Sequence, residues 1–326
     1  MRHPRSSVAR LMAVLAAAAL AVTACGGGAE APPAGGGGGG GSPSEVDLSG
    51  ASFTVGSKEF TEQKVLGQIA VQALKAAGAD VQDLTTITGS TNVRTALTSG
   101  QIDMYWEYTG TGWTTHLQHE PASAAKDPAQ LFQAVKDEDQ KNNIHWLDPA
   151  PLNNSYAIAV AADRDQGVTT MSEYAALVAR DPAAAKMCAA AEFLTRDDGF
   201  PGIEKTYGFD LPAGSMVELE LSLIPQQVAS GDNCKFGEVT TTDGAVASNK
   251  LKIIEDDKKF FVNYNAAMTV RQEVFDKNPK LAEVFDPISK ALTTEVVRGL
   301  NEKVDVGGEL EDDVAEQFLK DNGFVS

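Results

Sequence analysis

Histidine and cysteine, the residues most often used in catalytic and metal centres, are scarce in this chain. It has four histidines and three cysteines among 326 residues. It contains neither a Gly-x-Ser-x-Gly nucleophile motif nor a glycine-rich phosphate loop. His116 and His119 have a spacing that suits a shared metal on a helix, but nothing else in the surrounding sequence completes such a site. We interpret both as surface residues and the acidic group Asp137-Glu138-Asp139 as a solvated face or turn. We expect no enzyme activity, no metal and no cofactor.

Long apolar runs are also absent, apart from residues 11–22 near the N-terminus. Three arginines precede this run, which is too short for a comfortable membrane span and fits the apolar part of a secretory signal peptide. The run leads into Val-Thr-Ala-Cys, which resembles a lipobox, where the cysteine is lipidated and becomes the mature N-terminus. We predict a lipoprotein signal peptide over 1–24 and lipidation of Cys25. The alternative is a secretory signal with a chance cysteine.

A glycine-rich segment follows the predicted lipidation site. It includes seven consecutive glycines at 35–41, together with proline and serine and almost no apolar bulk. This composition is typical of a flexible coil. We predict a tether over 25–50 that lets the folded part move near a membrane surface.

The chain has fewer basic than acidic residues, with 27 lysines and arginines against 45 aspartates and glutamates. The net charge is −18, and removal of residues 1–24, which carry three arginines, changes it to −21. Such a chain is a poor partner for nucleic acid. The excess of acid permits a cationic ligand, although solubility alone explains much of it.

The two cysteines beyond Cys25 are Cys188 and Cys234. An even pair in an exported protein predicts a disulfide bond. Their separation excludes a metal knuckle, and two unpaired buried thiols are the alternative.

The composition, with 43% hydrophobic and 22% charged residues, is that of a globular protein with one large domain or two lobes. Strand patterns at 52–56, 81–87 and 101–104 alternate with helical patterns at 61–77 and 91–99. This order predicts an α/β fold with mixed sheets flanked by helices. Further strands are expected at 144–147, 156–160, 187–193, 217–221, 239–241, 251–254 and 260–270, and further helices at 128–141, 170–179, 281–292, 294–303 and 312–322.

Aromatic residues are only 7% of the chain, yet four of them lie in the eleven residues 103–113. In sheets covered by helices, ligands bind beyond the carboxyl ends of the strands. Tyrosine rings there can surround a cation, and Arg or Lys can hold a carboxylate. The pattern suits a small zwitterion with an onium head, although each residue alone also fits core packing or a solvated surface. The residues at such ends are Lys58, Gln63, Tyr108, Thr111, Asn154, Tyr156, Arg196 and Tyr264.

Several sequence runs resemble the substrate-binding proteins of osmoprotectant ABC importers, which take up glycine betaine, carnitine or choline. The resemblance covers residue 51 to the end and implies a two-lobed, type II periplasmic-binding-protein fold with the ligand cleft between the lobes. It implies lobe one at 51–155 and 265–326, and lobe two at 156–264. The runs are VGSKEFTEQ at 55–63, SGQIDMYWEYTGT at 99–111, NNSY at 153–156, RDDGFPG at 196–202, TDG at 242–244 and EDDKKFF at 255–261.

The resemblance also assigns roles to individual residues. The cage tyrosines of the family match Tyr108, Tyr156 and Tyr264, and Arg196 matches an arginine that grips a ligand carboxylate. Lys58, Gln63 and Thr111 match polar positions near that carboxylate, and the cysteine pair resembles one found in some members. Two positions depart from the pattern: Thr240 stands where a fourth cage tyrosine is common, and Ala245 where an arginine is usual. We include Thr240 among the predicted ligand-binding residues because of its position. Trp106 and Trp113 are candidates to replace the missing ring.

Together these features predict a monomeric solute-binding lipoprotein on the extracytoplasmic face of the cell membrane, which delivers a quaternary-ammonium or related zwitterionic solute to an ABC permease. One alternative is a different cationic solute, such as ergothioneine or an amino-acid derivative. Others are a sensory binding module and an enzyme on the same fold.

Overall fold

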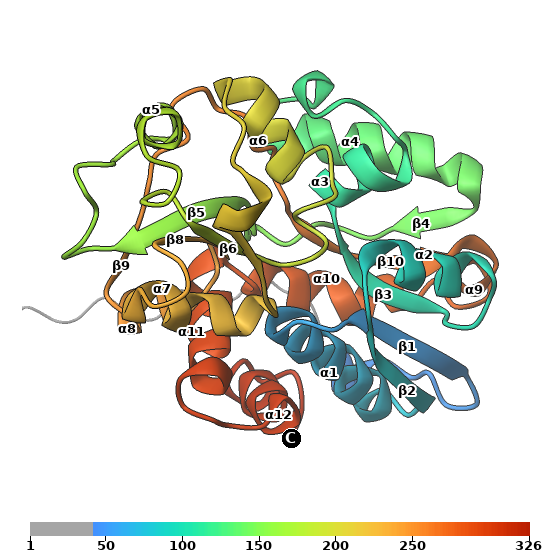
Figure 1. Cartoon of the computed structure of the whole chain (residues 1–326). Coiled ribbons are helices and arrows are strands. Elements are labelled where there is room, and N and C mark those ends of the chain that lie inside the picture. Colours follow the sequence, from blue (N-terminus) through green and yellow to red (C-terminus); the bar gives the residue numbers. More distant parts are fainter. Residues whose placement is uncertain (1–41) are drawn as a thin grey trace, which may run out of the picture. The chain divides into compact units, whose positions relative to one another are not determined.

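The computed structural model describes residues 42–326, and within them the strands form two five-stranded mixed sheets (Figure 1). Sheet A has the order β2-β1-β3-β10-β4, and sheet B has the order β7-β6-β8-β5-β9. The predicted α/β class with mixed sheets is confirmed. Sheet A consists of β1 (Ser52–Lys58), β2 (Asp80–Ile87), β3 (Met104–Tyr108), β4 (Ile144–Trp146) and β10 (Ala266–Arg271). Sheet B consists of β5 (Tyr156–Ala161), β6 (Met187–Ala189), β7 (Met216–Glu218), β8 (Phe236–Thr240) and β9 (Leu251–Ile253).

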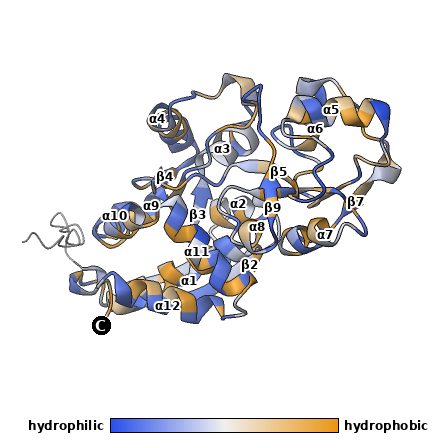
Figure 2. Ribbon diagram, turned by 90° about the vertical axis from the view of Figure 1, so that its left-hand side faces the viewer, coloured by the Kyte–Doolittle hydropathy of each residue, from blue (hydrophilic) through white to orange (hydrophobic). Residues whose placement is uncertain are grey.

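The helices gather around the sheet with which they share a core. Figure 2 shows α1, α10 and α12 with sheet A on its left side, and α5, α6 and α7 with sheet B on its right. The chain crosses from β4 to β5 and returns from β9 to β10. The α-helices are α1 (Thr61–Ala76), α2 (Ser90–Thr98), α3 (Thr109–Thr111), α4 (Pro128–Asp139), α5 (Met171–Arg180), α6 (Phe200–Tyr207), α7 (Ile224–Ser230), α8 (Ala245–Ser248), α9 (Gln272–Lys277), α10 (Leu281–Ala291), α11 (Thr294–Asp305) and α12 (Glu311–Asp321). The short 3-10 helices are η1 (Pro43–Glu45), η3 (Pro121–Ser123), η4 (Gln140–Asn142), η5 (Ala213–Ser215) and η6 (Leu221–Leu223), and η2 (Gly112–His116) is a short π-helix.

Local sequence explains where these helices begin and end. The apolar face of α1 is buried over Val65, Leu66 and Ile69, which recur at helical spacing. The chain leaves α1 through Gly78, whose φ of +87° is open to glycine without strain. A capping box opens α5, since Thr170 and Glu173 each accept a backbone N–H of the other.

The strand that contains the aromatic stretch begins later than predicted. It runs over β3 and not over 101–104, and all five of its side chains are buried. Because β3 lies in the middle of sheet A and packs on both faces, its sequence lacks the alternation that marks a one-sided strand. The strands predicted at 187–193, 217–221 and 260–270 were also too long, since β6 ends at Ala189, β7 ends at Glu218 and β10 begins at Ala266.

Strand β6 ends at Ala189 instead of residue 193, because the Ala190 N–H bonds to the Glu238 side chain. Residues 260–265, predicted as strand, are the irregular return to sheet A. There the Tyr264 N–H bonds to Asn153 Oδ1, and Asn265 Nδ2 donates to the Leu152 carbonyl, so side chains satisfy the backbone in place of a ladder.

The signal peptide, Cys25 and most of the predicted tether lie outside the described residues. The last part of the predicted tether is packed rather than free. Leu48 is buried in the core of sheet A, and Ser42 Oγ donates to the carbonyl groups of Gly323 and Phe324. The part of the chain that packs on the folded domain therefore includes Ser42. Over residues 42–326, no helix has both the length and the apolar character that a membrane crossing requires.

Cys188 and Cys234 form the predicted disulfide bond. Their sulfur atoms are 2.01 Å apart and their Cα atoms 5.6 Å apart. Cys188 lies on β6 and Cys234 just before β8, its parallel neighbour in sheet B. The bond joins two residues with a sequence separation of 46, and α7 lies in the loop that it closes.

Loss of this bond should destabilise the fold. The double substitution Cys188→Ser/Cys234→Ser should lower the free energy of unfolding by about 2–4 kcal/mol, because the unfolded chain regains the entropy of the open loop. Denaturant unfolding of both forms measures the difference. Peptide mapping of the unreduced protein that finds both thiols free would contradict the pairing.

Candidate functional site

A cavity of about 350 Å³ lies where the ends of the two sheets and the crossing segments meet. Eight of the nine predicted ligand-binding residues line it, and Gln63 does not. Gln63 is fully buried, and its Oε1 accepts the Lys58 N–H at 3.3 Å. The eight lining residues are Lys58, Tyr108, Thr111, Asn154, Tyr156, Arg196, Thr240 and Tyr264.

Sheet topology brings these distant residues together. Strands β1 and β3 are parallel neighbours, so Lys58 and Tyr108 at their carboxyl ends point to the same edge. The register between β1 and β2 shifts between Gly56 and Lys58, at the carboxyl end of β1. Tyr156 opens β5 after the first crossing, and Tyr264 precedes β10 on the return.

Three tyrosines of the cavity wall are fixed from behind. The Tyr108 hydroxyl donates to Glu62 Oε1 at 2.7 Å, and the Tyr264 hydroxyl donates to Asp198 Oδ2 at 2.6 Å. Tyr156 is held by its ring, which meets that of Tyr264 edge-on at 5.5 Å between centroids. Rings fixed in this way can present their faces to a ligand with little loss of side-chain entropy.

Gly110 makes room for the Tyr264 ring. A Cβ at this position would lie 2.5 Å from the ring, closer than any side chain tolerates. The Thr-Gly-Thr turn after β3 therefore uses glycine for close packing against a ring of the cavity wall.

Glu62, at the start of α1, accepts four hydrogen bonds from distant parts of the chain. Asn154 Nδ2 and the Tyr108 hydroxyl donate to its Oε1 at 2.9 and 2.7 Å, and Asn301 Nδ2 and the Thr242 hydroxyl donate to its Oε2. Burial raises the pKa of the Glu62 carboxyl, although the four donors counteract it. Sequence reasoning missed Glu62 as a site residue, although it stands inside the run at 55–63.

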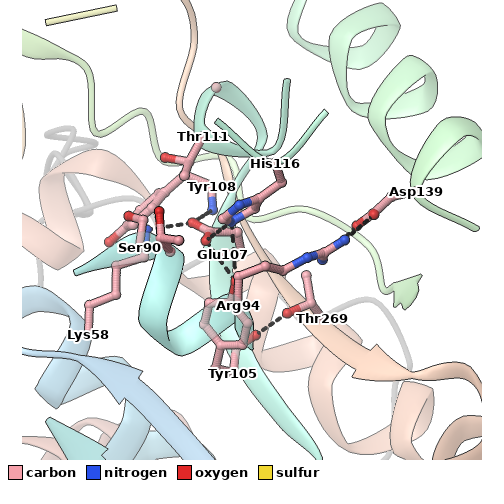
Figure 3. Close-up of polar contacts among 12 residues, drawn as sticks. Lys58, Ser90, Arg94, Tyr105, Glu107, Tyr108, Thr111, His116, Asp139 and Thr269 are labelled. Carbon is pink, nitrogen blue, oxygen red and sulfur yellow. Dashed lines mark hydrogen bonds and ion pairs between the residues drawn. The ribbon is translucent and has the colours of Figure 1, made fainter. Parts of the chain in front are cut away.

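Lys58 is held by a buried cluster of polar side chains (Figure 3). Its Nζ lies 2.6 Å from Glu107 Oε1, and the Tyr105 hydroxyl and His116 Nε2 both lie 2.8 Å from Glu107 Oε2. Burial disfavours the Glu107 carboxylate, but the Lys58 ammonium and His116 outweigh burial and hold the pKa of Glu107 well below its usual range. The ion pair with Glu107 therefore fixes the orientation of Lys58 at the wall.

Two predictions of surface character were wrong in this region. His116 is buried with 3% of its side chain exposed, and burial lowers the pKa of its imidazole. Asp139, predicted as part of a solvated acidic face, is fully buried because it pairs with Arg94 and accepts from Trp146 Nε1 at 2.7 Å. His119 is partly exposed and lies 3.0 Å from Glu138.

Arg196 is held by two carboxylates on the side of sheet B. Its Nε and Nη2 lie 2.7 and 2.5 Å from the two oxygens of Asp198, and its Nη1 lies 2.7 Å from Glu192. Its Nη2 also reaches Thr111 at 3.4 Å, on the far side of the cavity. Burial disfavours the Asp198 carboxylate, but the guanidinium outweighs it and lowers the pKa of Asp198.

Acidic residues outnumber basic ones on the cavity wall. Burial raises the pKa of Glu238 to about 8 and that of Asp243 to about 6. Lys58 and Arg196 are already paired with carboxylates, so the lining as a whole favours positive charge. The acidic lining residues are Glu59, Glu62, Glu192, Glu220, Glu238, Asp243 and Asp305, against Lys58, Lys64 and Arg196.

The two tryptophans considered as substitutes for a fourth tyrosine lie elsewhere. Trp106 is buried against Phe285, and Trp113 stacks on His119 with its Nε1 donating to Ser123. Neither lines the cavity. Neither tryptophan therefore replaces the fourth tyrosine that is missing at the position of Thr240. Histidine and cysteine are absent from the lining that residues 42–326 provide, and these residues form no group of three potential metal ligands. The arrangement is one for binding a small solute.

The chain is similar to known solute-binding proteins in sequence and in structure. The chain is 33% identical over 275 residues to the glycine-betaine-binding protein of Pseudomonas aeruginosa, covering 82% of this chain and 87% of that protein. It is 32% identical over 281 residues to the glycine betaine-binding protein YehZ of Escherichia coli, covering 83% and 90%. The structure of apo YehZ matches with a TM-score of 0.62 at 31% identity, over 84% of this chain and 99% of that one.

A third relative is named for a different solute. The ergothioneine transport permease/ergothioneine binding protein EgtU of Helicobacter pylori is 30% identical over 272 residues, covering 82% of this chain and 47% of that protein. The family described as the substrate binding domain of ABC-type glycine betaine transport systems matches residues 51–321, nearly all of the described part. By this match and by the two glycine betaine-binding relatives, the chain belongs to that family of substrate-binding domains.

Proposed function

We propose that this protein captures a quaternary-ammonium osmoprotectant, such as glycine betaine, outside the cytoplasm and delivers it to an ABC permease. The observation that carries the proposal is the cavity lined by Tyr108, Tyr156 and Tyr264 together with an excess of carboxylates. A quaternary ammonium has no N–H to donate, so it is recognised by ring faces and by negative charge. Both are present on this wall.

The other end of glycine betaine is a carboxylate, and the cavity wall has two cationic side chains that can bind it, Lys58 and Arg196. A guanidinium has five N–H donors. Four of those of Arg196 are directed at Asp198, Glu192 and Thr111, which leaves one on Nη1. Lys58 uses one of its three donors on Glu107. These remaining donors support the proposed contact between a ligand carboxylate and Arg196 or Lys58.

Closure of two lobes would enclose the solute. We assign lobe one to 51–155 and 265–326 and lobe two to 156–264, which follows the division of strands between the two sheets. Glu192, after β6, accepts Ser90 Oγ at 2.6 Å and the Ser90 N–H at 3.0 Å, at the start of α2. This contact and the contact between Arg196 and Thr111 each connect proposed lobe one with proposed lobe two. We propose that these bonds form when the lobes close.

The location follows from the N-terminal sequence. Lipidation of Cys25 would anchor a monomer to the extracytoplasmic face of the cell membrane through the glycine-rich segment. Such a tether keeps the binding domain close to its permease.

Calorimetric titration with glycine betaine, carnitine, choline and ergothioneine tests the function. We expect the first three to bind, and Tyr156→Ala to weaken them about two- to thirtyfold, because a desolvated cation–ring contact contributes about 0.5–2 kcal/mol. The matched variant Tyr156→Phe keeps the ring and should bind like the wild type. Binding of none of the onium solutes below about millimolar concentration would show that the substrate class is wrong, and selective binding of ergothioneine would favour the alternative solute.

The role of Arg196 has its own comparison. Arg196→Ala should weaken glycine betaine about 10- to 150-fold, the range for a lost hydrogen bond to a charged group, and choline much less, because choline has no carboxylate. The control is Arg196→Lys, which keeps a positive charge next to Asp198 and Glu192. It shows how much of the loss comes from leaving these two carboxylates unpaired. Equal losses for the two solutes would exclude the carboxylate contact.

The anchor can be tested in cells. Cys25→Ala should abolish incorporation of labelled fatty acid and release the protein from the membrane fraction, because no acyl chain remains to hold it. Labelling followed by membrane fractionation measures both effects. A variant that remains labelled and membrane-bound would place the attachment at another residue.

A further inference from the structure

Glu238 on β8 is a buried carboxyl group that faces the cavity with few partners. Its exposed fraction is 2%, and it belongs to the lining. Its Oε2 accepts the Ala190 N–H at 2.7 Å, which is its one hydrogen bond within residues 42–326. Its Oε1 is therefore left for whatever occupies the cavity.

The other two fully buried glutamates at this site are satisfied by the protein itself. Glu62 accepts four hydrogen bonds, and Glu107 accepts three and pairs with Lys58 as well. Glu238 has one hydrogen bond and no cation in contact. Burial of a carboxylate without a counter-charge is costly, which is why the pKa of Glu238 rises to about 8 and the group holds its proton at neutral pH.

The position of Glu238 places it beside the predicted cage. Residues two apart on a strand share a face, so Glu238 points to the same side of β8 as Thr240. Thr240 pairs with Tyr156 in the register of β5 and β8, and Tyr156, Thr240 and Glu238 all line the cavity. The titratable and charged groups that line the same cavity include Tyr156 on β5, Glu192 and Arg196 after β6, Glu220 before η6 and Asp243 after β8. Of these, Glu192 raises the pKa of Glu238 and Arg196 lowers it.

We propose that Glu238 is the counter-charge for the cationic head of the solute, and that it releases its proton when the cation binds. This assignment rests on the proposed function and deepens it. The O–H bond of the carboxyl group breaks and the proton passes to the solvent. The carboxylate then attracts the cation without forming a covalent bond, and Arg196 remains paired with Asp198 and Glu192.

Two consequences follow from this assignment. Binding of a cation should tighten as the pH rises towards 8, because less work is needed to ionise Glu238. The protein should also prefer choline over 3,3-dimethyl-1-butanol, in which carbon replaces the charged nitrogen in the same shape. Ring contacts and burial alone discriminate less between these two solutes than a carboxylate does.

Calorimetry in phosphate and Tris buffers at pH 7 tests the proposal with choline and glycine betaine as probes. Because the two buffers differ in ionisation enthalpy, the difference in measured heat gives the number of protons released. The wild type should release close to one proton for each cation bound, and its Kd should fall up to tenfold between pH 6 and 7. Glu238→Gln has the shape of the protonated group, so it should fold, release no proton and bind independently of pH, with a reduced preference for choline over the neutral analogue.

The control variant is Glu218→Gln, an exposed change on β7 outside the cavity, which should behave like the wild type. If the wild type and Glu238→Gln release equal numbers of protons and show the same pH dependence, the role of Glu238 is overturned while the proposed function stands. If the wild type binds neither cation, the proposed function fails and this assignment fails with it.

Discussion

The cavity depends on the burial of charge, and Glu62 shows how the fold meets that constraint. A carboxyl group removed from water has to regain its lost hydrogen bonds from the protein. For Glu62 the donors are Tyr108 at the end of β3, Asn154 in the crossing segment, Thr242 after β8 and Asn301 on α11. One side chain thus joins both sheets, a crossing segment and a C-terminal helix, and it fixes a tyrosine of the wall.

The same constraint distinguishes the charged groups of the wall that are paired within the protein from Glu238, which is not. Lys58 is balanced by Glu107, and Arg196 by Asp198 and Glu192, so these cations are fixed in orientation before any solute arrives. Glu238 has no such balance, and the small side chain of Thr240 lies beside it. A positively charged solute would supply the missing partner. In this account, preorganised pairs give the cavity its shape and one unbalanced carboxyl group gives it a preference for charge.

Much of the fold was predictable from sequence, because helical and strand periodicities are local. The residues at strand ends, such as Lys58 and Tyr108, could be found because the α/β pattern predicts where strands end. The partners of these residues could not, since Glu107, Asp198 and Glu62 look like ordinary surface acids until the fold places them. His116 and Asp139 were taken for surface residues for the same reason. Glu238 gave no signal, because one acid in a short strand does not reveal that it lacks a partner.

A crystal structure with bound glycine betaine tests the central claim most directly, because it locates both ends of the solute. The account predicts the trimethylammonium group among the rings of Tyr108, Tyr156 and Tyr264 on the side of Glu238, with the solute carboxylate directed at Arg196 or Lys58. A trimethylammonium group bound away from these rings, or a solute carboxylate in contact with Glu238, would contradict it.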